Sequence, residues 1–265
     1  PQIDKCQEGK LPGDTALAEH YRYSNRMLML IHTEQSPVDT LFDVREWARF
    51  AAWSDIFYGH HAMACHNARM FYNAETKRVE PVAWDPKSYG FLPYEGPTTF
   101  LSHYVNDYPI YKLLNTDPWF AHWYVIELDK SIDHGRFEFL YKDHKHIADQ
   151  LQSLITEPRS TPRFDPTYLQ NTKKFLRQQF FIADPVYIEL QPEKQVLYVQ
   201  NRSVLPIVIQ SIEWHEEGNP EPIRIDLEET FFTSKSIPLS QLPTGKFKVY
   251  YRLPTESMSR DMESW

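Results

Sequence analysis

The spacing of the apolar residues changes near residue 184, and this change limits what the chain can fold into. Before that point, apolar side chains recur at intervals of three and four, the pattern of helices that bury one face. From Asp184 onward, short or alternating apolar runs are separated by Pro, Gly, Asn or Glu, as in a sandwich of short strands. We therefore predict an α+β chain: a mainly helical domain over residues 1–183, followed by a small, immunoglobulin-like all-β sandwich domain over residues 184–265.

Each of the two parts can be divided into elements. Start signals and apolar spacing predict helices over residues 14–30, 36–58, 117–131, 137–154 and 165–180. The segment 137–154 is expected to pack along one apolar face. Strands are predicted over residues 186–190, 196–200, 207–213, 223–227, 234–239 and 247–253, and the polar residues after them are expected to be frayed.

A predicted β-hairpin interrupts the helical part. Its strands are expected over residues 69–73 and 79–84, because both runs are rich in aromatic or β-branched residues and a polar turn separates them. Asn67 enters the first strand, and Asp85 leaves the second. Because the open ends of a hairpin lie together, we expect the amide and the carboxylate to meet.

These two side chains have more than one interpretation. Amide and carboxylate oxygens are ligands that a hard cation such as Mg²⁺ accepts, with room left for phosphate oxygens. Asn67 and Asp85 could instead cap turns at the ends of the hairpin. A third interpretation is a metal-dependent hydrolase, in which His60, His61 and His66 join Asp85 in a zinc site with an open position.

The same stretch resembles a known family. HNARMFYN at residues 66–73, followed by VEPVAWD at residues 79–85, is similar to the core of the CotH family, the spore-coat-type atypical protein kinases and their bacterial relatives. DVREWARFAAWSDIFYGHH, directly upstream, is similar to the helix that precedes this core, and the resemblance extends from residue 37 to about residue 182.

The resemblance implies a kinase-C-lobe-like fold for the helical domain, built around the hairpin. In protein kinases an Asn of the catalytic loop and an Asp after the next hairpin hold the metal ions. By this resemblance Asn67 and Asp85 are ligands of Mg²⁺ or Mn²⁺, and ATP binds beside Trp84 and His66. It also implies a secreted, periplasmic or cell-surface bacterial protein.

The chain departs from the kinase pattern at the catalytic base. The kinase catalytic Asp lies five residues before the metal-binding Asn, and that position is Ala62 here. His61, one residue away, is the candidate replacement. Asp55 is the nearest upstream carboxylate and the second candidate; the alternative is that it lies on the surface near the end of its helix.

The upstream sequence departs from the kinase pattern as well. Only Lys5 and Lys10 precede the core, and no Gly-rich motif does, so the N-terminal lobe is expected to be missing. The chain begins at Pro1, which suggests a fragment or a processed product. We therefore expect phosphotransfer to be weak or lost.

Composition excludes some partners and leaves others open. A net charge of −8 disfavours nucleic acid, which needs a basic face. No apolar run approaches the roughly 18 residues of a membrane span. Three hypotheses remain: a kinase-fold protein that binds Mg²⁺ and a nucleotide, with a protein as its substrate; a pseudokinase scaffold that contacts a cell-surface protein; and a metal-dependent hydrolase.

Overall fold

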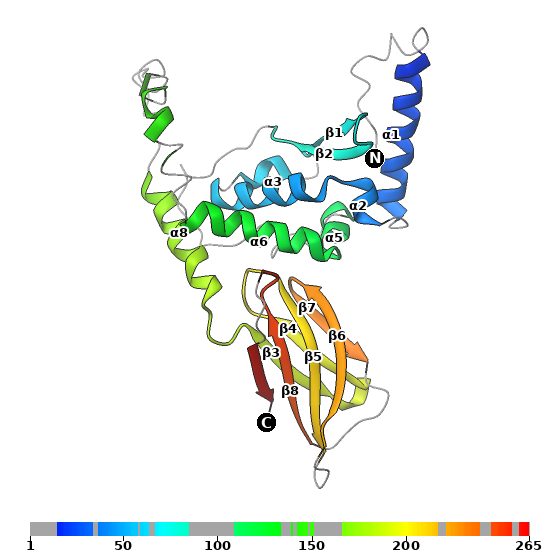
Figure 1. Ribbon diagram of the computed structural model, residues 1–265, viewed down its shortest axis with the longest axis vertical. Coiled ribbons are helices and arrows are strands. Elements are labelled where there is room, and N and C mark those ends of the chain that lie inside the picture. Colours follow the sequence, from blue (N-terminus) through cyan, green and yellow to red (C-terminus); the bar gives the residue numbers. More distant parts are fainter. Residues whose placement is uncertain are drawn as a thin grey trace.

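The computed structural model describes residues 15–33, 37–57, 59–63, 67–84, 109–133, 139, 142–147, 149–150, 166–216, 221–238, 245–255 and 260–264. Its helices and one β-hairpin form the upper part of Figure 1, and the other strands form the lower part. Helix α8 (Pro166–Phe180) leads down into the first of those strands, β3 (Val186–Gln191). The predicted mixture of helices with antiparallel sheets is confirmed, and the change in apolar spacing falls between these two elements.

Helices α3 (Val44–Phe57) and α6 (Pro118–Asp133) form the centre of the upper part, side by side (Figure 1). α3 buries small side chains such as Ala48 and Ala52, whereas α6 buries large ones such as Phe120. Small residues facing large ones fill an interface without voids. The surrounding helices are α1 (Thr15–Thr33), α2 (Val38–Leu41) and α5 (Pro109–Asn115).

The single helix predicted over residues 36–58 is wrong, because the chain forms two helices there. Phe42 is extended, with φ −119° and ψ 148°, and it ends α2. Asp43 then accepts the backbone N–H of Glu46 on its Oδ1 at 3.1 Å, an N-terminal cap for α3. The break allows Phe42 to be fully buried and to bridge Val79 of the hairpin.

Helix α6 begins with a similar cap. Asp117 Oδ1 accepts the backbone N–H groups of Trp119 at 2.8 Å and of Phe120 at 2.9 Å. Burial raises the pKa of the Asp117 carboxyl, the two N–H donors oppose that rise, and the charge of Asp39 adds to it. The cap therefore stabilises the helix while its charge carries a cost.

Two substitutions separate the cap from the charge. Asp117→Ala is expected to lower the free energy of unfolding by about 1 kcal/mol, because two N–H groups lose their acceptor. Asp117→Asn keeps the acceptor oxygen. The pKa of Asp117 in the folded state lies above its ordinary 3.8. The folded protein therefore takes up a proton at a higher pH than the unfolded chain does. As the pH falls through the folded pKa, protonation of Asp117 increases the free energy of unfolding.

Urea unfolding of the wild type and Asp117→Asn between pH 7 and pH 4 measures that difference. The wild type should gain stability relative to Asp117→Asn as the pH falls. Parallel pH profiles for the two proteins would contradict the assignment.

The lower part consists of two antiparallel sheets. One has the strand order β3–β4–β7 and the other has the order β6–β5–β8–β9. The bounds of these strands are β4 (Val196–Asn201), β5 (Ile207–Glu216), β6 (Ile223–Phe231), β7 (Ser234–Pro238), β8 (Gly245–Arg252) and β9 (Arg260–Ser264). Both sheets contribute to one apolar cluster, with Leu197 from the first sheet and Ile209 and Val249 from the second.

The apolar cluster continues upward into the helices. Phe232 follows β6, and its ring centroid lies 6.5 Å from that of Phe120 and 6.4 Å from that of Tyr124, both on α6. Aromatic rings at such separations stabilise each other beyond the area they bury. Helices and sheets are therefore joined by a packed contact at this corner.

One further expectation from the sequence is wrong, and another is tested only in part. The residues after 253 were expected to be frayed, yet Arg260–Ser264 forms β9 and pairs with β8, with Phe247 opposite Ser264. A packed face was expected over residues 137–154. Within the described part of that segment, residues 142–147 are helical and Ile147, which belongs to the expected face, is 43% exposed. Most of the other apolar residues of that face lie outside the described residues, so for them the expectation stays a prediction.

Within the described ranges, no helix combines the length and the apolar character needed to cross a membrane.

Candidate functional site

The hairpin is fixed to the start of α3. β1 (Arg69–Asn73) pairs antiparallel with β2 (Arg78–Val82). The carbonyl of Val79 in β2 accepts the indole N–H of Trp47 at 2.9 Å and the backbone N–H of Asp43 at 3.2 Å. Because both donors belong to the start of α3, the hairpin is held against that helix, on the side away from α6 (Figure 1).

The open end of the hairpin holds two of the predicted site residues. The last pair of the register is Arg69 opposite Val82. Asn67 lies two residues before Arg69, and Trp84 lies two residues after Val82, so both are just outside the strands at this open end. Asp85 follows Trp84 directly and His66 precedes Asn67, but both lie outside the described residues. The expected meeting of Asn67 with Asp85 therefore stays a prediction.

Asn67 is the proposed cation ligand that the structure describes. Its Nδ2 is buried and has no hydrogen-bond partner in the described part of the chain. This amide N–H₂ is a donor that needs an acceptor such as a phosphate oxygen, whereas the amide oxygen of an Asn is an accepted ligand of Mg²⁺. The backbone of Asn67 lies in a turn directly before β1, so the hairpin fixes its position.

The histidines precede Asn67 on a 3₁₀ turn, η2 (His60–Met63). The side chain of His61 is half-buried there. The side chain of His60 and the whole of His66 fall outside what the structure describes. Among the residues it does describe, no three His, Cys, Asp or Glu side chains gather as a metal site. The zinc interpretation depends on His60, His66 and Asp85 and so stays a prediction.

The position at which the resemblance to kinases expects a catalytic base belongs to the core. Ala62 is 1% exposed, and its N–H donates to the carbonyl of Gly59 at 3.1 Å. The neighbouring Met63 carbonyl accepts the hydroxyl of Tyr111 from α5. These contacts hold η2, and therefore Ala62, against the helices.

Asp55, the second candidate base, is buried in α3. The alternative interpretation of Asp55 as a surface residue is wrong, because it is only 3% exposed. It accepts a hydrogen bond from the hydroxyl of Tyr124 on α6. A carboxylate inside a helix interface stabilises that interface through its hydrogen bonds, and Asp55 would have to be uncovered before it could reach a substrate.

The large exposed apolar residues of the hairpin were not predicted from the sequence. Met70, Phe71, Val82 and Trp84 are all exposed, and Trp84 is the most exposed of them at 56%. A two-stranded hairpin has little core of its own, so large apolar residues on it are left for another partner. The signal was present in the sequence, since RMFYN reads as a strand without clear alternation of polar and apolar residues.

The described part of the candidate site thus consists of Asn67 and Trp84 at the open end of the hairpin, which β2 fixes to α3, and of the η2 turn that precedes them in the chain. No protein-family model, curated protein or solved structure matches this chain. Function is therefore inferred from these residues.

Proposed function

We propose that the open end of the hairpin binds Mg²⁺ together with the phosphates of a nucleotide such as ATP. The observation that carries the proposal is the Asn67 amide, whose nitrogen is buried without a partner in the described chain and can donate to a phosphate oxygen. The Asn67 oxygen and the Asp85 carboxylate would hold the ion, and Mn²⁺ could replace Mg²⁺. The bound ion would neutralise phosphate charge, as it does in kinases.

The other residues of the site have supporting roles in this proposal. Trp84 is exposed beside Asp85 and offers a flat ring against which a base can stack. His66 precedes Asn67 and could donate to a phosphate oxygen. The Trp47 and Asp43 contacts with Val79 keep the hairpin in place, which limits the entropy lost on binding.

Phosphotransfer is expected to be weak in this proposal. The position five residues before Asn67 is the buried Ala62, which has no group that accepts a proton. Asp55 is hydrogen-bonded inside the α3–α6 interface. His61 is the remaining candidate base on η2, and a neutral imidazole can accept a proton near pH 7.

Metal-dependent nucleotide binding tests the proposal directly. Isothermal titration calorimetry with ATP should show binding in Mg²⁺ and none in EDTA. Asp85→Ala should weaken that binding about 10- to 100-fold, because a charged ligand is lost. The melting temperature should stay close to that of the wild type.

The control for this experiment is Asp184→Ala, which removes an exposed carboxylate at the start of the sheets. It should leave nucleotide binding unchanged. If Asp85→Ala lowers the melting temperature strongly, Asp85 caps a turn. If ATP binds equally well in EDTA, the metal proposal fails.

A second function is favoured by the exposed apolar residues of the hairpin. Phe71 and Val82, which lie on the same side of the hairpin, could form with Trp84 the contact surface of a pseudokinase scaffold for a cell-surface protein. The resemblance to secreted and surface-located bacterial proteins agrees with that role. Absence of ATP binding by a folded wild type would favour the scaffold over the nucleotide-binding protein.

A further inference from the structure

The two long edges of the hairpin differ, and the edge of β1 is left open. The carbonyl of Val79 in β2 accepts the backbone N–H of Asp43 and the indole N–H of Trp47, so it points away from β1 and toward α3 (Figure 1). β2 also carries Pro81, which has no N–H to offer another strand. In the described part of the chain, β1 pairs with β2 and with no other strand.

The register shows which backbone groups face the open edge. In an antiparallel pair, residues that bond each other alternate with residues whose N–H and C=O groups point outward. Val79 is of the second kind, and Tyr72 lies opposite it. Met70 follows the same alternation, and it lies opposite Pro81, whose missing N–H would also have pointed outward. The edge of β1 thus offers the N–H and C=O groups of two residues, and no bond to them is found in the described part of the chain.

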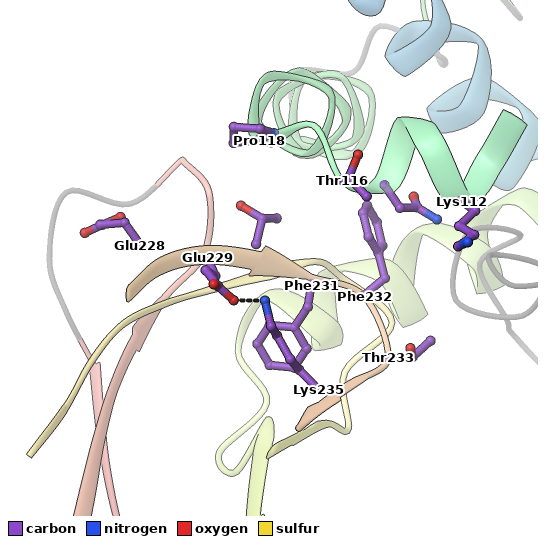
Figure 2. A pocket seen from close by; sticks show the side chains of 11 residues that line it. Lys112, Thr116, Pro118, Glu228, Glu229, Phe231, Phe232, Thr233 and Lys235 are labelled. Carbon is purple, nitrogen blue, oxygen red and sulfur yellow. Dashed lines mark ion pairs between the residues drawn. The ribbon is translucent and has the colours of Figure 1, made fainter. Parts of the chain in front are cut away.

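Another edge strand of this protein is protected against further pairing. Soluble proteins commonly protect such edges with charged residues, prolines or bulges. In β6 most of the exposed residues are charged, and its register with β5 shifts at a bulge. Glu228 of this strand pairs with Arg252, and Glu229 pairs with Lys235 beside a cavity of about 420 Å³ (Figure 2). The charges next to β6 are therefore already matched within the chain.

β1 lacks this protection at its centre. Met70, Phe71 and Tyr72 follow one another in the sequence, and the register with β2 is regular from Arg69 to Asn73. Phe71 is 54% exposed. An unprotected edge with exposed apolar side chains is a template for an additional strand.

The two faces of β1 are occupied differently. The ring of Tyr72 packs against α1, with its centroid 5.2 Å from that of Tyr23 and 6.2 Å from that of His20. Arg69 and Phe71 point to the opposite face, because side chains alternate along a strand, and both are exposed. An added strand would therefore be recognised through its side chains next to Phe71 and Arg69.

We propose that the open edge of β1 binds an extended segment of a partner protein as an added antiparallel strand. This rests on the scaffold function and specifies how the partner is held. The partner residue opposite Phe71 is aromatic or β-branched, and the residue two places later is acidic because it lies opposite Arg69. Arg69 has no ion pair among the described residues. A second copy fits less well, because β1 paired with itself about Phe71 would place Arg69 opposite Asn73 and leave its charge unmatched.

The test measures binding of a capped peptide to the full chain by isothermal titration calorimetry. The peptide is acetyl-Ser-Thr-Val-Phe-Thr-Glu-Ser-amide, with its Phe intended for the place opposite Phe71 and its Glu for the place opposite Arg69. N-methylation of its Val and its second Thr removes the two N–H groups that face Tyr72 and Met70, so binding should weaken about tenfold or more. N-methylation of its Phe removes an N–H that points away from β1 and should weaken binding far less.

Two variants of the protein test the same geometry. Met70→Pro should abolish binding and leave the melting temperature close to that of the wild type, because the N–H that it removes points out of the hairpin. Arg69→Glu should weaken binding about fivefold or more, and a peptide with Lys in place of Glu should restore it. Arg78→Glu is the control: it makes the same change of charge, but Arg78 lies on β2, opposite Asn73 and away from the added strand.

Three results would overturn the proposal. The first is no binding of the peptide to the wild type, and the second is an equal loss of binding for the two patterns of N-methylation. The third is a wild-type dimer in analytical ultracentrifugation that Met70→Pro makes monomeric, which would identify a second copy as the occupant.

The functions proposed for the hairpin can fail separately. If both patterns of N-methylation act equally while Phe71→Ser weakens binding, the scaffold function stands and the added strand fails. Met70→Pro should retain any Mg²⁺-dependent binding of ATP, and Asp85→Ala should retain peptide binding.

Discussion

Replacing Trp47 with alanine is expected to lower the free energy of unfolding by about 3–5 kcal/mol, the range for removal of a large aromatic side chain from a core. Trp47 is 1% exposed, and its ring packs edge-on against Phe42 at a centroid distance of 5.6 Å. Its indole N–H also donates to the Val79 carbonyl of β2. The substitution therefore removes both core volume and one of the two hydrogen bonds that hold the hairpin to α3.

Trp47→Phe separates these two effects. It keeps most of the ring volume, and the Val79 carbonyl still accepts the N–H of Asp43. Its cost should be about 1–2 kcal/mol, near that of one buried hydrogen bond with a small loss of packing. Trp119→Ala is the matched control, because Trp119 is 62% exposed and its loss should change stability by less than about 0.5 kcal/mol.

Urea unfolding gives the three free energies, and hydrogen exchange reports on the hairpin. The amides of β1 and β2 should exchange faster in both Trp47 variants than in Trp119→Ala, because their anchor to α3 is weakened. A Trp47→Ala protein as stable as Trp119→Ala would show that Trp47 does not belong to the core. Unchanged exchange in Trp47→Phe would show that the indole hydrogen bond does not hold the hairpin.

Helices and strands could be predicted from the sequence where the apolar residues follow a helical or a strand-like pattern. The strand predicted over residues 196–200 is β4 (Val196–Asn201), and the one predicted over residues 69–73 is β1 with the same bounds. Short runs of apolar, aromatic or β-branched residues with turn residues on either side marked these strands. β9 was missed because RDMES, at the sheet edge, is held by backbone pairing with β8 and has only one apolar residue, Met262.

Other features depend on residues far apart in the sequence. The apolar spacing runs on through Phe42 and Asp43, so it did not reveal the break between α2 and α3, which depends on the contact of Phe42 with Val79. Asp55 looked like a surface carboxylate because its partner, Tyr124, comes from a helix 69 residues later.

Phosphotransfer from Mg²⁺-ATP to a protein or peptide is expected to be slower by about 10²- to 10⁴-fold than with a positioned base, which is the usual contribution of general base catalysis. In activation free energy this is about 3–5 kcal/mol. The reason is that Ala62, buried in the η2 turn, stands where the resemblance to kinases expects the catalytic base. An Ala62→Asp protein is not expected to recover activity, because the new carboxylate would be placed in the core and would cost stability.

His61 is the residue through which any remaining transfer would act. It lies beside Ala62 on η2, and its side chain is half-buried rather than sealed in the core. Transfer of radiolabelled phosphate in Mg²⁺ or Mn²⁺ should be compared for the wild type, His61→Ala and Asp55→Asn, with His215→Ala as the control on the exposed end of β5. Asp55→Asn should lower stability, because the Tyr124 hydroxyl then faces a neutral amide in place of a carboxylate.

The outcomes distinguish a weak enzyme from a binding protein. Slow transfer that is abolished by His61→Ala, and unchanged by His215→Ala, would make His61 the base. Transfer that is lost only in Asp55→Asn, at a temperature where that variant stays folded, would mean that Asp55 leaves its contact with Tyr124 during the reaction. Positioning and charge stabilisation supply nearly all of the acceleration in phosphoryl transfer. Rapid transfer in all variants would therefore mean that the bound metal and the positioned nucleotide provide the acceleration without a side-chain base. ATP binding without any transfer would favour a scaffold in which the hairpin binds the nucleotide and the exposed Phe71 is left to contact a partner.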